Sequence, residues 1–168
     1  MKKLVLKAQS GDKEAFVRLM EIHKSSMLKV ARSFFSEPFD IEDVMQDTIM
    51  SCWANLLTLK QPEYFKTWLI RILINHCNAV LKNRPKTVSI DTVTEVGSEE
   101  YDPDQMNFDD IIEILDNKYR IVLTLYYNDG FTTSEISDIL NIPTETVKTR
   151  LKRGREQLYQ YLKGGDHQ

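Results

Sequence analysis

The sequence predicts an all-α protein of two small helical domains joined by an acidic flexible linker, the second domain ending in a helix-turn-helix. Apolar residues recur at three- and four-residue steps through most of the chain, which is the helical period. This period is lost from Lys86 to about Tyr101, where acidic residues gather, and it returns at Met106. We therefore expect a first domain at 1–85, a linker at 86–105 and a second domain at 106–168.

The first domain is expected to contain three main helices. Apolar residues from Glu14 to Arg32 fall at helical spacing, and the same pattern returns from Phe65 to Leu81. Between these two helices, Pro38 to Asp43 predicts a helix start, with Asp40 as its N-cap. That helix is expected to end near Leu59, before the turn at Pro62.

Charge is distributed unevenly along the chain. From Val88 to Asp116 the sequence holds ten Asp and Glu residues and no Lys or Arg. Since the whole chain carries −3, the remainder carries +7, so a nucleic-acid partner is compatible with the acidic total.

Composition also limits the class of protein. The chain has no apolar run of about twenty residues, so no membrane insertion is expected. Cys52 and Cys77 are isolated, which is typical of reduced thiols in a cytoplasmic protein and predicts no metal site. No pattern indicates a cofactor.

Residues 131–156 predict the helix-turn-helix. Thr132 and Glu135 form a capping-box pair, Pro143 ends the first helix, and Thr144 is the expected N-cap of the second. In the second helix we expect four apolar side chains to pack inward: Val147, Leu151, Leu158 and Leu162. The other faces carry Lys148, Arg150, Lys152, Arg153 and Arg155. A solvated basic face would have the same charges, but the turn and cap favour a helix that enters the DNA major groove.

Two further polar surfaces are predicted in the first domain. One is the acidic surface of Glu42, Asp43, Gln46 and Asp47, on neighbouring helical steps. Carboxylates at a helix start more often serve the helix dipole than catalysis, and no His or Cys ligand is nearby, so we expect a protein-contact surface and no catalytic residue.

The second surface lies on the helix after Pro62. Its polar stripe is made of Thr67, Arg71, Asn75, Asn78 and Lys82. Tyr64 and Phe65 precede the stripe, and rings, amides and cations together suit unstacked bases. Trp68 is expected in the core instead, and a core position for Phe65 is the alternative.

Three motifs carry a family resemblance. DIEDVMQDT from Asp40, FKTWLIRI from Phe65 and TVKTRLKRGR from Thr146 resemble, in order, motifs of the extracytoplasmic-function (ECF) RNA polymerase sigma factors. The resemblance implies a first domain that binds core polymerase and melts the minus-ten element, and a second that contacts the minus-thirty-five element. The implied partners are the β′ and β subunits, promoter DNA and an anti-sigma factor. Lys152 and Gly154 stand where other members often carry a different residue and an alanine.

The resemblance also implies roles for individual residues. Core polymerase would be bound by Glu42, Asp43, Gln46 and Asp47. Promoter melting would involve Tyr64, Phe65, Lys66, Arg71, Asn75 and Asn78. Major-groove contacts would come from Lys148, Thr149, Lys152 and Arg153, and phosphate contacts from Thr146, Arg150 and Arg155.

Two other function classes remain to be compared. A stand-alone helix-turn-helix regulator acting as a dimer would explain the basic helix but would not need the polymerase surface or the aromatic loop. An enzyme is unsupported, because no nucleophile–base pair, phosphate loop or metal spacing occurs in the sequence. The acidic linker suggests a polyanion that occupies the basic RNA path of polymerase or lies against the basic faces of the free protein.

Overall fold

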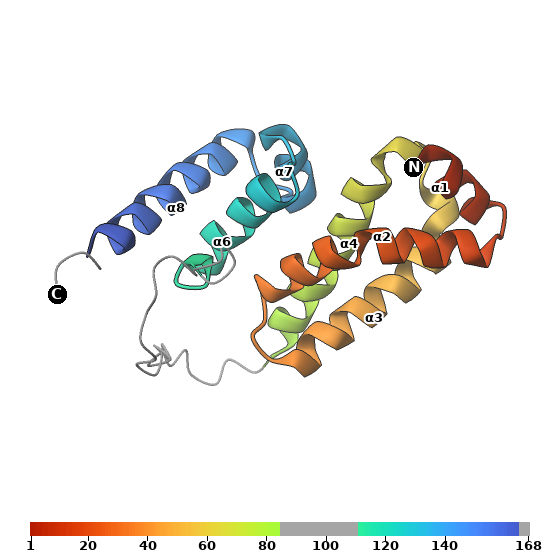
Figure 1. Cartoon of the computed structure of the whole chain (residues 1–168), viewed down its shortest axis with the longest axis horizontal. Coiled ribbons are helices and arrows are strands. Elements are labelled where there is room, and N and C mark those ends of the chain that lie inside the picture. The colour runs from red at the N-terminus through yellow and green to blue at the C-terminus, as the bar shows by residue number, and fades with distance from the viewer. Residues whose placement is uncertain (85–110, 165–168) are drawn as a thin grey trace.

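The computed structural model describes residues 1–84 and 111–164 (Figure 1). These residues are mostly helical, and no strand occurs among them, so the all-α prediction is confirmed. The predicted linker at 86–105 lies outside the described residues.

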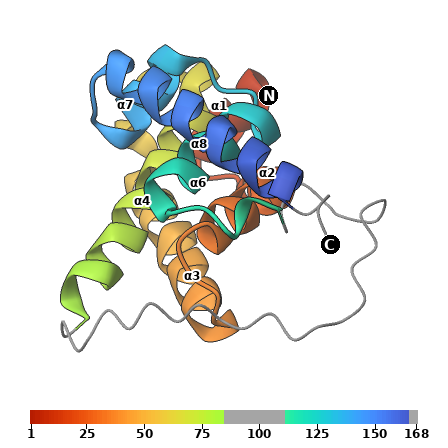
Figure 2. The ribbon, with the colours of Figure 1, turned by 90° about the vertical axis from the view of Figure 1, so that its left-hand side faces the viewer.

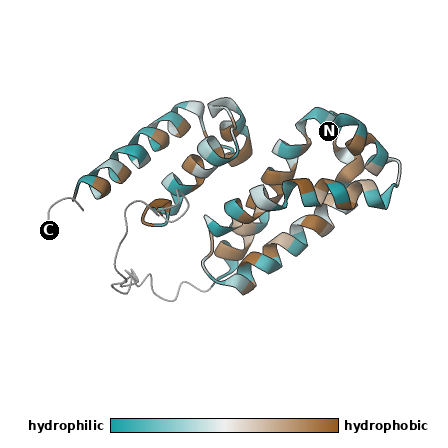
Figure 3. Ribbon diagram, in the orientation of Figure 1, coloured by the Kyte–Doolittle hydropathy of each residue, from teal (hydrophilic) through white to brown (hydrophobic). Residues whose placement is uncertain are grey.

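The first domain is built from four α-helices and two short 3-10 turns. They are α1 (Lys2–Gln9), α2 (Lys13–Arg32), α3 (Pro38–Asn55), η1 (Leu56–Thr58), η2 (Pro62–Tyr64) and α4 (Phe65–Asn83). Helices α2, α3 and α4 pack against one another around buried residues such as Leu19, Val44, Leu69 and Leu73. Hydrophobic residues lie largely where these helices face each other (Figure 3).

The start of α3 differs from the prediction. Glu37 takes the N-cap position and Pro38 the first helical position, so Asp40 lies within the first turn and is not the cap. Proline suits that first position because its fixed φ is helical and no backbone donor is lost there. The Asp40 carboxylate instead pairs with Arg84 at the end of α4, whose guanidinium lies 5.4 Å from the Phe35 ring centroid.

The second domain contains the predicted helix-turn-helix. It consists of α6 (Asn117–Leu123), a π-helical turn η4 (Thr124–Asn128), α7 (Thr133–Leu140) and α8 (Thr144–Gly164). The Thr132–Glu135 capping box is present at the start of α7, as predicted. Asn141 ends α7 in the left-handed region with φ of 52°. The turn between the two helices is therefore set by Asn141 and Pro143.

The second helix begins one residue earlier than predicted. The Val147 N–H donates to the Pro143 carbonyl at 3.1 Å, which places Thr144 inside α8 rather than at its N-cap. Val147 and Leu151 are buried and Leu158 is half-buried, but Leu162 is 50% exposed. The inward packing predicted for Leu162 is wrong, because the last turns of α8 extend beyond the helices that cover its start (Figure 1).

Gly154 lies where α8 crosses α6. A Cβ atom on this residue would lie 2.9 Å from Leu123 Cδ1 and 3.3 Å from Tyr119 Cβ. Close packing of α8 on α6 therefore favours glycine over alanine at this position.

The two domains lie side by side in contact. Helix α7 packs against α4, and η4 packs against α2 (Figure 2). The Asn117 side-chain amide donates to the Ser33 carbonyl at 2.8 Å across the boundary. Polar groups of the first domain are thus engaged by the second.

Candidate nucleic-acid interface

The start of helix α8 presents the four predicted major-groove residues to solvent. Lys148, Thr149, Lys152 and Arg153 are all exposed, and much of the helix is hydrophilic (Figure 3). Lys148 pairs with Glu145 at 2.7 Å and Lys152 with Glu156 at 3.9 Å. No such ion pair is found for Arg153 among the described residues, so its guanidinium is the more available donor.

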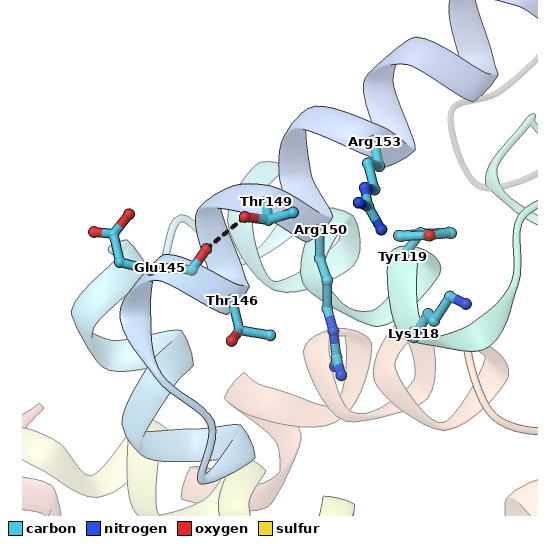
Figure 4. Close-up of a pocket in the computed structure, with 7 residues that line it drawn as sticks. All are labelled: Lys118, Tyr119, Glu145, Thr146, Thr149, Arg150 and Arg153. Atoms are coloured by element: carbon cyan, nitrogen blue, oxygen red, sulfur yellow. Dashed lines mark hydrogen bonds between the residues drawn. The ribbon is translucent and has the colours of Figure 1, made fainter.

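A basic pocket of about 330 Å³ lies beside α8 where it meets α6. Its lining residues are Lys118, Tyr119, Glu145, Thr146, Thr149, Arg150 and Arg153. Arg150 and Arg153 extend from α8 toward the side where Lys118 lies (Figure 4). Three cations around one hollow favour an anionic ligand, and DNA offers phosphates beside a helix that lies in its major groove. Arg155, the third predicted phosphate residue, is exposed, and its Nε donates to the Leu151 carbonyl at 3.1 Å.

The polar stripe of the first domain lies on the outer side of α4. Arg71, Asn75, Asn78 and Lys82 are exposed and Thr67 is half-buried. The stripe is thus available to a ligand along most of its length. Arg71 is the exception, since its guanidinium donates to the backbone carbonyl of Asp138 in α7.

The aromatic loop before α4 divides into an exposed and a buried part. Tyr64 is 52% exposed, whereas Phe65 has no exposed surface and packs with the rings of His23 and Trp68. The prediction that Phe65 contacts a base directly is therefore wrong. Its ring instead anchors the loop in the core. Helix α4 begins at Phe65, so the buried ring lies where the loop joins the helix.

Sequence reasoning missed a cavity of about 480 Å³ between α3 and α4. Its lining residues are Ser51, Asn55, Thr58, Trp68, Ile72, Asn75, His76 and Ala79. Trp68 is only half-buried and forms part of the wall, so the expected core position holds in part. The volume is within the range of small-ligand sites.

Hydrogen bonds organise the polar side of this cavity. Ser51 Oγ lies 2.9 Å from His76 Nε2, and the Asn55 amide donates to the Ser51 carbonyl at 2.9 Å. Asn75 is the one wall residue that was predicted to act in promoter melting. The sequence signal for this site was the four-residue step from Ser51 to Asn55, which places both residues on one face of α3. Only the packing of α3 on α4 brings them to His76.

The acidic surface of α3 is fully accessible. Glu42, Asp43, Gln46 and Asp47 are all exposed, together with the apolar side chains of Phe39 and Met50, each within one helical turn of them. Exposed apolar side chains next to charges are typical of protein interfaces. The surface therefore fits a protein partner.

The titratable core groups are unsuited to chemistry. Burial raises the pKa of Cys52 and of Cys77 to about 12, so both thiols stay protonated near neutral pH. Burial also lowers the pKa of His23, helped by the Lys66 charge and opposed by Asp129. Within residues 1–84 and 111–164, no cluster of three or more His, Cys, Asp or Glu residues could hold a metal ion. None of the helices in those ranges is both long and apolar enough to span a membrane.

Comparison with known proteins gives two family matches. Residues 19–85 match the sigma-70 region 2 model, and residues 105–158 match the sigma-70 region 4 model. The chain is 28% identical to the ECF RNA polymerase sigma factor SigW of Bacillus subtilis, with 97% of each chain covered. It is 25% identical to the ECF RNA polymerase sigma-E factor of Escherichia coli, over 92% of this chain and 90% of the relative.

Solved structures resemble the whole fold. CnrH, in complex with the cytosolic domain of CnrY, gives a TM-score of 0.72 at 26% identity, with 97% of each chain covered. The sigma factor RpoE of Bartonella quintana, in complex with the anti-sigma factor NepR, gives 0.72 at 25% identity, over 88% of this chain and 96% of RpoE. The likeness thus extends over nearly the whole chain and includes both helical domains.

Proposed function

The chain belongs to the extracytoplasmic-function (ECF) sigma factors of RNA polymerase, and we propose that its two domains divide promoter recognition between them. As a sigma factor it directs polymerase to promoters and initiates transcription there. A stand-alone regulator is not favoured, because such a protein would not need the region 2 domain.

The second domain is proposed to bind the minus-thirty-five element. Lys148, Thr149, Lys152 and Arg153 would contact base edges in the major groove, where an exposed helix of this size fits. Thr146, Arg150 and Arg155 would contact phosphates, with the basic pocket beside α6 supporting this role.

The first domain is proposed to open the minus-ten element. The observation that carries this proposal is the cavity between α3 and α4, because it puts one aromatic wall and several hydrogen-bonding side chains next to the polar stripe. Trp68 offers a stacking face, while Asn55, Asn75 and His76 offer donors and acceptors for a base edge. A base turned out of the duplex would enter the cavity, and Tyr64, Lys66, Arg71 and Asn78 would hold the displaced strand.

The remaining partners follow from the surfaces and from the family. Glu42, Asp43, Gln46 and Asp47 are proposed to bind the β′ subunit of core polymerase, with further contacts to the β subunit. We propose an anti-sigma factor as a regulatory partner, because the RpoE relative is seen bound to one. The chain is expected to act in the cytoplasm, where polymerase is.

Reconstitution with core polymerase tests this division. The complex should initiate from a subset of a promoter library, and thymines near the minus-ten element should become reactive to permanganate. Asn75→Ala should lower permanganate reactivity more than promoter binding, whereas Arg153→Ala should lower binding. Lys13→Ala, at an exposed position far from both surfaces, is the control. Equal loss of binding and opening in both variants would contradict the assignment.

A further inference from the structure

The segment that joins α3 to α4 carries one residue of the cavity wall and one residue proposed to hold the displaced strand. This segment, the connecting loop, covers residues 56–64 and includes the turns η1 and η2. Thr58 lines the cavity between the two helices, and the exposed Tyr64 ends the loop. The position of the connecting loop therefore sets where both side chains lie relative to the cavity.

Local backbone bonds hold the connecting loop only weakly. The Leu59 N–H donates to the Leu56 carbonyl at 3.3 Å, which closes a three-residue turn. The Tyr64 N–H donates to the Gln61 carbonyl at 3.1 Å in the same way. Bonds of this 3-10 type have poorer geometry than those of an α-helix, and the carbonyls that follow the end of α3 have no next helical turn to donate to them. The loop therefore depends on contacts with other parts of the domain.

Gln9, the last residue of α1, supplies such a contact. Its side-chain Nε2 donates to the Leu56 carbonyl at 3.0 Å and to the Leu59 carbonyl at 2.9 Å. These two carbonyls lie 47 and 50 residues along the chain from Gln9, on either side of Thr58. Helix α1 also packs against both η1 and η2 (Figure 1). One side chain thus spans the part of the loop that contributes to the cavity wall.

A second contact between α1 and the connecting loop is weaker. Lys2 and Glu63 form an ion pair at 3.7 Å, but their side chains are 64% and 52% exposed. Exposed ion pairs contribute little to stability, because water and salt screen them. Gln9 is half-buried, and its amide nitrogen has one N–H for each of the two carbonyls. The Gln9 amide is therefore the stronger of the two contacts.

Gln9 can hold the loop because its own position is fixed. Val5 and Ala8 are buried, where α1 packs against α2. The helix then ends in a defined turn, in which Gly11 adopts a φ of +96°, a conformation that suits glycine. The Asp12 side chain caps the start of α2 directly after this turn. Gln9 thus projects from a helix that is anchored along its buried face and at its end.

We propose that Gln9 is a positioning residue for promoter opening, whose amide holds the connecting loop, and with it Thr58 and Tyr64, beside the cavity. The inference rests on the proposed role of the cavity and of Tyr64 in opening the minus-ten element. A side chain of α1 thus supports a site built from α3 and α4 without contacting DNA itself. When the amide is lost, the loop samples other positions, and the fraction of chains ready to accept an unpaired base falls.

Gln9→Met tests the proposal in the holoenzyme formed with core polymerase. Methionine has nearly the length and volume of glutamine but no N–H donor. Two hydrogen bonds of ordinary strength correspond to roughly thirtyfold in the equilibrium between a held and a released loop, so we expect permanganate reactivity of the minus-ten thymines to fall by about three- to thirtyfold. Binding of the minus-thirty-five duplex should be unchanged, because Gln9 lies in the other domain.

Two variants at the same position give the rescue and its counterpart. Gln9→Lys restores N–H donors, so it should recover most of the lost permanganate reactivity. Gln9→Glu places acceptor oxygens opposite two carbonyls and should be at least as defective as Gln9→Met. A general loss of packing at Gln9 would not produce this order. A Gln9→Lys holoenzyme as defective as Gln9→Met would overturn the proposal.

Ser10→Ala is the matched control on α1. The Ser10 hydroxyl donates to the Lys7 carbonyl at 2.7 Å, inside the last turn of the helix. Its removal weakens the end of α1 but not the contact of Gln9 with the loop, so promoter opening should stay as in the unchanged chain. Equal loss of opening in Ser10→Ala and Gln9→Met would reduce the effect to the stability of α1 and would refute the positioning role.

Hydrogen exchange in the free chain reports on the loop without polymerase or DNA. Gln9→Met should speed exchange at the amides of Leu59 and Tyr64, while the amide of the buried Leu73 in α4 stays protected. Faster loop exchange with normal opening would show that opening does not need a held loop, and the proposal would fail. If Asn75→Ala lowers opening but Gln9→Met changes neither exchange nor opening, the positioning role fails while the cavity function stands. If Asn75→Ala leaves opening unchanged as well, the proposed cavity function fails with it.

Discussion

Arg153 and Arg150 lie three residues apart on α8, and the structure predicts different losses when each is replaced by alanine. Both side chains line the basic pocket beside Lys118, but Arg153 is exposed whereas Arg150 is half-buried. The more exposed Arg153 is the proposed base contact and Arg150 the proposed phosphate contact. Both changes remove one positive charge, so charge alone cannot distinguish them.

The expected magnitudes follow from the two kinds of contact. Loss of one phosphate contact lowers the slope of log affinity against log salt by about 0.9. For Arg150→Ala this means roughly an eightfold loss at 0.1 M salt and roughly threefold at 0.3 M, for every duplex sequence. Loss of a bidentate base contact by Arg153→Ala costs about 1–3 kcal/mol, roughly 5- to 150-fold, on the preferred sequence alone.

The assay is a salt titration of duplex binding with the full-length chain, on a selected minus-thirty-five duplex and on a scrambled one. Lys163→Ala supplies the control, because Lys163 is a cation at the far end of α8 that lies over the Tyr159 ring. It should leave both duplexes nearly unchanged. If Arg153→Ala lowers the salt slope and weakens both duplexes equally, Arg153 contacts phosphate and the assignment is refuted.

Three further outcomes are expected. Glu145→Gln should tighten duplex binding by up to about fivefold at low salt, because it frees Lys148 from an exposed ion pair worth about 0.2–1 kcal/mol, and the gain should vanish at high salt. Gly154→Val should lower the free energy of unfolding in urea by about 1–3 kcal/mol, since its Cβ would press on Leu123, and an unchanged midpoint would contradict that packing. Burial lowers the pKa of His23, so the unfolded chain takes up a proton first and stability should fall as the pH drops below about 6.5. In the His23→Gln variant, the melting temperature should no longer show the part of its fall below about pH 6.5 that His23 causes.

Local signals predicted the helix-turn-helix well. The capping box at Thr132 and Glu135 depends on residues three apart, and the exposed cations of α8 follow from helical period alone. Such features need no knowledge of distant contacts. The exposure of the acidic residues of α3 was predictable for the same reason, since they lie on adjacent helical steps.

The errors share a different cause, which is competition between neighbouring residues or the absence of a packing partner. Asp40 and Thr144 are good caps, yet a proline one or two residues before each sets where its helix begins. Leu162 fits the apolar period of α8 but has no helix above it to pack on. Phe65 could be a stacking ring or a core ring by sequence, and only the closing of α4 on α2 buries it.

The contacts between the domains could not be predicted from the sequence. Ser26 and Asp129 are 103 residues apart, and no local pattern pairs them. Their pairing is also incomplete, because the buried Asp129 Oδ2 has no hydrogen-bond partner within the described part of the chain. A buried carboxylate that is only partly satisfied stabilises an interface weakly, since desolvation offsets much of its attraction to Lys66. The packing of the two domains on each other therefore gains little stability from this contact.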